Sequence, residues 1–131
     1  GPAWRAYATV LGHWRLNGCG MFAIVARDDG RTIGLAGPWF PGGWPERELG
    51  WSIWRVEDEG RGFAFEAVTA ARAHAFDALG WSTAVSYIDP ANTRSIALAE
   101  RLGCVLDPQA ETPAGLSAVA YRHAGRGTNQ G

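Results

Sequence analysis

The sequence predicts an α/β (α+β) fold in which helices cover the faces of a mixed sheet. Apolar residues recur at helical or strand spacing in the order helix, three strands, helix, strand, helix, strand. The strand, helix, strand succession implies a crossover between two parallel strands. The 131 residues, 47% of them hydrophobic, suit one compact domain, which we place at residues 3–124.

The first part of the chain predicts a helix and a β-hairpin. A helix is expected over residues 3–16, because one stripe of apolar residues recurs every three or four positions: Trp4, Tyr7, Val10, Leu11 and Trp14. Two short apolar runs follow at 21–26 and 32–37. The turn signal Asp28-Asp29-Gly30 separates them, so they are expected to pair as a hairpin.

The second part predicts two strands that flank a helix, followed by a helix and a final strand. Residues 48–54 alternate as a strand does, and the helix expected at 63–79 carries a buried stripe of Val68, Ala71, Ala75, Phe76 and Leu79. A buried strand at 83–88 is rich in β-preferring residues. The remaining elements are a short helix at 93–102 and a strand at 116–123.

A glycine-rich turn, Glu59-Gly60-Arg61-Gly62-Phe63-Ala64, joins the third strand to the second helix. A helix start leaves its first N–H groups without partners and carries partial positive charge, so it favours an anion. Gly60 and Gly62 have no side chains to block the approach, and Ala64 has only a methyl group. The amides of Gly62, Phe63 and Ala64 are therefore expected to hold a diphosphate, with Arg61 as an additional mobile cation.

Composition argues against several classes of function. The net charge of −1 gives no basic surface for nucleic acid, and no apolar run is long enough to cross a membrane, so we expect a cytoplasmic protein. Cys19 and Cys104 lack metal-ligand spacing, so no metal site is expected. The isolated histidines, His13, His74 and His123, are expected on the surface or in packing. The ends, 1–2 and 125–131, are expected to be a cloning remnant and a flexible tail.

A second signature follows about thirty residues after the glycine-rich turn, in Asp89-Pro90-Ala91-Asn92-Thr93-Arg94-Ser95 and onward to Glu100-Arg101-Leu102-Gly103. Together with Gly60-Arg61-Gly62-Phe63-Ala64-Phe65-Glu66-Ala67, it closely resembles the GCN5-related N-acetyltransferase (GNAT) superfamily. The strand that begins Glu48-Leu49-Gly50-Trp51 is similar to the Rim-type branch, which acetylates protein N-termini. The resemblance runs from the first helix to Gly103, most of the chain.

The resemblance implies a largely antiparallel sheet whose parallel pair splays apart at the cofactor site. It further implies that acetyl-CoA donates its acetyl group to a primary amine by direct attack in a ternary complex. The residues that it assigns to the cofactor are Ile53, Trp54 and Arg55 through their backbone, Gly60, Arg61, Gly62, Phe63 and Ala64 in the turn, and Asn92 and Ser95. Asn92 has an equally good interpretation as the N-cap of the following helix.

Two side chains are candidates for proton transfer. Glu48 is the first choice for the general base, because it begins the strand beside the expected thioester, and Glu46 is the second. The alternative is a solvated charge at a strand end. Many relatives carry a tyrosine acid in the late helix, where this chain has Ala99; Ser95 could relay a proton instead, or could simply be a helix residue.

The sequence departs from the family pattern in two places. Glu59 stands where a glutamine or arginine usually begins the cofactor turn, and we expect it to point away from the ligand and to have an arginine as a possible partner. Members of the family usually have one more strand and helix before the helix expected here at 3–16, and this sequence has no match for them. We therefore expect a truncated start, an exposed sheet edge and the potential for a homodimer.

Other functions remain as alternatives or fail on their motifs. A Rossmann site would need a third glycine where Phe65 stands, and a phosphoryl-transfer loop would need a lysine, of which the chain has none. A non-catalytic acyl-CoA-binding module remains open. The acceptor amine also stays open among protein N-termini, aminoglycosides, polyamines and other small molecules or peptides.

Overall fold

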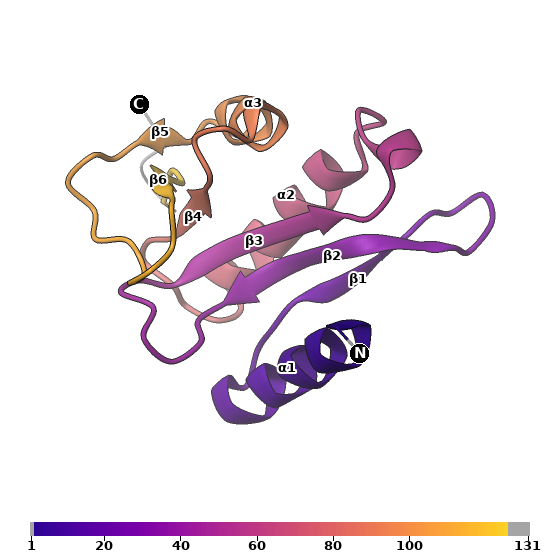
Figure 1. Ribbon diagram of the computed structural model, residues 1–131, viewed down its shortest axis with the longest axis horizontal. Helices are drawn as coiled ribbons and strands as arrows, with labels where there is room; N and C mark the ends of the chain where they lie inside the picture. The colour runs from indigo at the N-terminus through magenta and orange to yellow at the C-terminus, as the bar shows by residue number, and fades with distance from the viewer. Residues whose placement is uncertain (1, 126–131) are drawn as a thin grey trace.

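The computed structural model describes residues 2–125, with the backbone alone at residues 2–8 and 56 (Figure 1). The predicted remnant and tail therefore lie almost wholly outside the described residues. The elements in chain order are α1 (Pro2–Asn17), β1 (Phe22–Val25), β2 (Thr32–Trp39), β3 (Glu48–Ile53), the 3-10 turn η1 (Val56–Asp58), α2 (Phe63–Asp77), β4 (Val85–Ile88), α3 (Thr93–Arg101), β5 (Val105–Leu106) and β6 (Val119–Arg122).

The strands form one mixed sheet in the order β1-β2-β3-β4-β6-β5. Every neighbouring pair is antiparallel except β3 and β4, which run parallel and are joined by α2. The sequence-based prediction of a mixed, largely antiparallel sheet with one parallel pair is confirmed. The order places the parallel pair in the middle of the sheet, where its carboxyl ends face α2 and α3.

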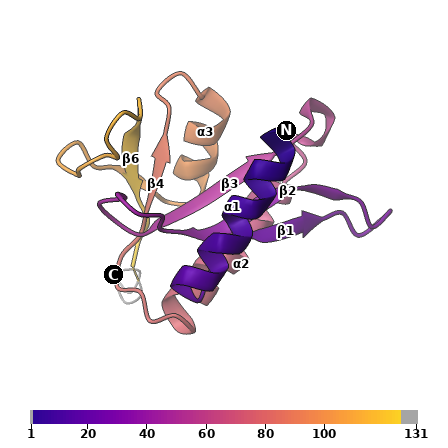
Figure 2. The ribbon, with the colours of Figure 1, turned by 60° about the horizontal axis from the view of Figure 1, so that its bottom comes forward.

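Helices cover both faces of the sheet. α2 lies against β2 and β3, and Figure 2 shows α1 crossing the opposite face. The predicted α2 stripe is confirmed: Val68, Ala71, Ala75 and Phe76 are buried, and Leu79 packs beside them. A Cβ at Gly50 would meet the methyl group of Met21 at 2.6 Å, so a side chain at this position of β3 would require the flexible end of Met21 to move.

The buried face of α1 differs from the predicted stripe. Leu11 is 51% exposed, whereas His13 is 5% exposed. The side chains of Trp4 and Tyr7 lie outside the described residues. His13 tolerates burial because both ring nitrogens have partners: Nδ1 donates to the Cys19 carbonyl at 2.9 Å, and Nε2 accepts from the Phe40 N–H at 2.6 Å. Its ring also stacks on Trp39.

Several strand limits differ from the predictions, most at β2 and β6, and one strand was not predicted. β2 continues through Pro38 to Trp39. Its pairing with the antiparallel β1 reaches only to Ala36, which lies opposite Phe22, so β1 does not need an N–H from Pro38. β6 begins at Val119, three residues later than expected. β5, only two residues long, was not predicted, because a strand that short has no readable periodicity.

Candidate functional site

The parallel strands β3 and β4 separate almost as soon as they meet. Their only paired residues are Glu48 and Val85, with the Val85 N–H donating to the Arg47 carbonyl at 3.1 Å. Beyond that point side chains satisfy the exposed backbone groups. The Tyr87 N–H donates to the Glu48 carboxylate at 2.9 Å, and the Ser86 hydroxyl donates to the Leu49 carbonyl at 2.6 Å. These two side-chain bonds give the Tyr87 N–H and the Leu49 carbonyl the partners that strand pairing does not supply, which lowers the free-energy cost of the splay.

Ser86 is itself held by a buried histidine. His123, 2% exposed, donates from Nε2 to the Ser86 hydroxyl at 2.8 Å, and its Nδ1 accepts from Arg72 at 3.3 Å. Burial, with the nearby Arg72 charge, lowers the pKa of His123 to about 3. The ring is therefore neutral at pH 7, and His123 is a packing residue, as predicted.

Glu48 lies at the start of the splay and is only 7% exposed. The solvated strand-end charge considered as an alternative is therefore wrong. Its carboxylate accepts from Trp44 Nε1 at 2.9 Å as well as from the Tyr87 N–H. Burial raises the pKa of Glu48 above that of an ordinary glutamate, and the two hydrogen bonds oppose the rise. A buried carboxylate with raised proton affinity is suited to general-base chemistry.

Glu46, the second candidate base, is committed to an ion pair. Both of its oxygens accept from Arg122, at 2.9 and 2.8 Å, and these hydrogen bonds lower the pKa of Glu46. A carboxylate whose proton affinity has fallen is a weaker base. Between the two carboxylates, the geometry therefore favours Glu48.

The glycine-rich turn has the backbone that its sequence requires. Gly60 and Gly62 have φ angles of +77° and +82°, and a Cβ at either position would meet nothing within 4 Å. Gly62 is the N-cap of α2 and makes no side-chain capping bond. Its carbonyl accepts the Glu66 N–H at 3.0 Å. The start of α2 thus presents bare backbone amides to open space, which is the geometry of an anion site.

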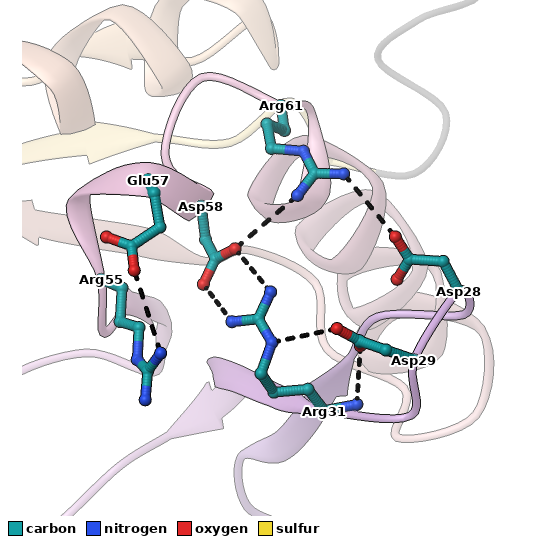
Figure 3. Close-up of polar contacts among 7 residues, drawn as sticks. All are labelled: Asp28, Asp29, Arg31, Arg55, Glu57, Asp58 and Arg61. Carbon is teal, nitrogen blue, oxygen red and sulfur yellow. Dashed lines mark hydrogen bonds and ion pairs between the residues drawn. The ribbon is translucent and has the colours of Figure 1, made fainter.

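A buried carboxylate fixes this turn to the β1–β2 hairpin (Figure 3). Asp58, 1% exposed, accepts two hydrogen bonds from Arg31 at 2.8 and 3.0 Å, and these bonds lower the pKa of Asp58. Arg31 also contacts Asp29. The Arg61 guanidinium lies between Asp58 and Asp28, at 3.8 and 3.9 Å, so in this structure it is held on the hairpin side of the turn.

The start of α3 forms the facing wall. Asn92 is the N-cap, and its side-chain oxygen accepts the Ser95 N–H at 3.1 Å, which confirms its capping interpretation. The Ser95 hydroxyl accepts from Trp51 Nε1 of β3 at 3.1 Å. Ala99 is fully buried, so the position that holds a tyrosine in many relatives is part of the core here.

Glu59 is not turned away from the ligand side as expected. It lies on the wall of the cleft between the turn and α3, where it is hydrogen-bonded to Arg94 of α3. The arginine partner was anticipated, but its position across the cleft was not. This pair joins the two walls.

The cleft has a volume of about 590 Å³, within the range of small-molecule sites. It is lined by β3, the glycine-rich turn, α2 and α3. The predicted cofactor residues that line it are Ile53, Gly60, Gly62, Phe63, Ala64, Asn92 and Ser95. Glu48, Trp54, Arg55 and Arg61 lie outside its lining. The Trp54 N–H donates to Ile33 of β2 at 2.9 Å, so this group points away from the splay.

The aromatic residues at the end of β2 and in the loop between β2 and β3 divide between packing and the site. Trp39 and Phe40 contact His13 of α1, whereas Trp44 bonds Glu48 and lies edge-on to Tyr87.

Within residues 2–125, no helix is long and apolar enough to span a membrane. The same part of the chain contains no cluster of three or more His, Cys, Asp or Glu side chains able to hold a metal ion.

A family model described as an acetyltransferase (GNAT) domain matches residues 1–105. The chain belongs to the GNAT acetyltransferase family. Members of this family generally use acetyl-CoA as the acyl donor. The bare amides at the start of α2, the nearby strand splay and the volume of the cleft fit a ligand with a diphosphate and an extended arm.

Solved structures of GNAT proteins share the fold. An acetyltransferase from Agrobacterium tumefaciens str. C58 is 38% identical over 92% of this chain and 70% of that one, with a TM-score of 0.83. A protein from Bordetella pertussis assigned to the GnaT family is 29% identical over 93% and 75% of the two chains, with a TM-score of 0.76.

More distant structures support the fold alone. Ribosomal-protein-S5-alanine acetyltransferase from Vibrio fischeri is 17% identical, covers 95% of this chain and 72% of that chain, and has a TM-score of 0.69. The search of the curated proteins found no match.

Proposed function

We propose that this GNAT domain is an N-acetyltransferase of the Rim-type branch that transfers an acetyl group from acetyl-CoA to a primary amine. The observation that carries the proposal is the cleft between the carboxyl end of β3, the uncapped start of α2 and the facing wall of α3. Gly60, Gly62, Phe63 and Ala64 would hold the diphosphate through their backbone. Ile53, Arg55 and Asn92 would contact the pantetheine arm.

Glu48 is the proposed general base. A protonated amine has no lone pair, so the reaction requires its proton to move to an acceptor before nitrogen bonds to the acetyl carbon. The Glu48 carboxylate, directly or through water, takes that proton. Its burial favours the protonated form, whereas the bonds from Trp44 and Tyr87 hold it in one orientation. When the C–S bond breaks, the leaving thiolate needs a proton, and the Ser95 hydroxyl on the cleft wall would relay one.

The family likeness and the site support an amine as the class of acceptor, without selecting one amine. The Vibrio fischeri protein is named a ribosomal-protein-S5-alanine acetyltransferase, which supports a peptide α-amine as the first acceptor to test. A small-molecule amine is the alternative. A cytoplasmic setting is consistent with Cys19 and Cys104, which are both unpaired thiols.

A homodimer through the edge of the sheet is proposed as well. β1 is an edge strand, and its Phe22 and Val25 side chains are 42% and 51% exposed. An exposed apolar edge strand can pair with the same strand of a second chain. Sedimentation velocity over a concentration series tests this association.

Titration calorimetry with acetyl-CoA, followed by thiol release measured over a panel of amines, tests the proposed activity. The panel would contain peptides with free N-termini, polyamines and aminoglycosides. Binding together with amine-dependent thiol release supports the proposal. Binding without thiol release from any amine would instead favour a non-catalytic acyl-CoA-binding module, and failure to bind acetyl-CoA would reject both.

A further inference from the structure

The ion pair between Glu59 and Arg94 stands directly across the proposed coenzyme cleft. Glu59 follows η1 on the turn, and Arg94 lies in the first turn of α3, so the pair spans 35 positions in the chain. Both side chains line the cleft, and both are accessible: 30% exposed for Glu59 and 64% for Arg94. A pair this accessible is held weakly and can exchange its partner.

The charges that line the cleft are balanced before any ligand enters. Two lining residues are arginines, Arg94 and Arg101, and two are carboxylates, Asp58 and Glu59. Asp58 is already satisfied by Arg31 and is almost fully buried. Arg101 lies 4.1 Å over the Phe65 ring. Arg94 is therefore the lining cation whose partner is an accessible carboxylate on the opposite wall.

A coenzyme with a diphosphate and a further phosphate brings several negative charges into this balanced cleft. The Glu59 carboxylate would repel them, whereas a guanidinium binds phosphate oxygens through charge-assisted hydrogen bonds. Arg61 is drawn towards Asp58 and Asp28 on the hairpin side. The side chain best placed to neutralise the incoming charge from across the turn is thus Arg94, which is bonded to Glu59 before the ligand enters.

We propose that Arg94 binds the diphosphate of the coenzyme and that Glu59 competes with it, so that binding exchanges the Glu59–Arg94 ion pair for an Arg94–phosphate contact. The proposal rests on the acetyl-CoA site proposed above. It assigns opposite roles to two neighbouring groups: Arg94 strengthens coenzyme binding, and Glu59 weakens it. It also explains how the chain tolerates an acidic residue where the family pattern has glutamine or arginine, since the cation is supplied from α3.

Titration calorimetry of acetyl-CoA with four variants tests the exchange. Glu59→Gln frees Arg94 and should tighten binding by about three- to tenfold. Arg94→Gln removes a charge-assisted bond and should weaken binding by about ten- to a hundredfold. In the double variant the gain from Glu59→Gln should be reduced, because Arg94 is no longer there to release.

Glu57→Gln is the matched control. It removes one negative charge two positions away, from a side chain that is 68% exposed and pairs with Arg55 outside the cleft lining, so its affinity should stay within about twofold of wild type. Weaker or unchanged binding by Glu59→Gln, or unchanged binding by Arg94→Gln, would overturn the exchange. Wild-type protein that does not bind acetyl-CoA would reject the proposed coenzyme site itself, so the two failures are distinguishable.

Discussion

A methyl group at Gly62 tests the proposed diphosphate site, and Gly80 provides an internal control. Both glycines have left-handed backbones, with φ of +82° and +72°, and a Cβ at either would meet nothing within 4 Å. They flank the same helix: Gly62 caps the start of α2, and Gly80 follows its end. α2 has 15 residues and is about 22 Å long, and of the two glycines only Gly62 lines the cleft.

The effect of each alanine on stability follows from its backbone alone. Without a clash, the left-handed conformation is destabilised by about 1–2 kcal/mol for alanine relative to glycine. An unfolding entropy of about 2.1 cal/mol/K per residue, applied to 131 residues, turns this into a fall in Tm of about 4–7 °C for either variant. Gly62→Ala and Gly80→Ala should therefore melt at similar temperatures, both below wild type.

Their coenzyme affinities should differ. The methyl group at position 62 stands beside the amides that the diphosphate would approach, and loss of one charge-assisted hydrogen bond lowers affinity about ten- to a hundredfold. Gly80→Ala should bind acetyl-CoA within about twofold of wild type. Gly62→Val, with its larger side chain, should abolish binding. Calorimetry at a temperature well below both melting transitions measures these values. Equal affinities for Gly62→Ala and Gly80→Ala would mean that the diphosphate does not approach this turn.

Three further predictions concern β3 and its partners. Glu48→Gln should lower kcat by about a hundredfold or more. In wild type kcat should fall as the pH drops through the raised pKa of Glu48, because the protonated carboxyl cannot take a proton. If the Glu48→Gln variant shows the same fall of kcat at low pH, Glu48 is not the base. Leu49→Ala, at a fully buried position, should lower the urea-unfolding free energy by about 2–5 kcal/mol, whereas Leu116→Ala, 45% exposed, should change it by less than about 0.5 kcal/mol. Ser86→Ala leaves the Leu49 carbonyl and His123 without their partner and should destabilise by about 1–3 kcal/mol; wild-type stability would show that the splay does not need this hydroxyl.

The elements of this fold could be predicted because each depends on a local pattern. The turn at Gly60 and Gly62 was recognisable from two residues without side chains before an apolar helix, and the structure gives both the positive φ that only glycine adopts easily. The parallel pair followed from a strand, a helix and a strand in succession. Asn92 showed its capping role through its position before a helix.

The contacts that shape the site could not be predicted, because they join residues far apart in the chain. Asp58 and Arg31 are 27 positions apart, and no spacing rule links a residue of a hairpin turn to one before a helix. The same is true of Glu59 and Arg94. The sequence places Asp58 directly before the glycine-rich turn, but nothing in the local pattern identifies Arg31 as its partner.

Glu48 connects the shape of the cleft with its proposed chemistry. The carboxylate accepts the Tyr87 N–H, which an ordinary parallel pairing would bond to a backbone carbonyl of β3, so the side chain helps to keep the strands apart. The bonds from Tyr87 and Trp44 stabilise the charged form, whereas burial favours the neutral one. A proton taken from an amine would weaken the hold of the carboxylate on Tyr87. The strength of the base and the opening between β3 and β4 are therefore coupled, and a substitution that alters one should alter the other.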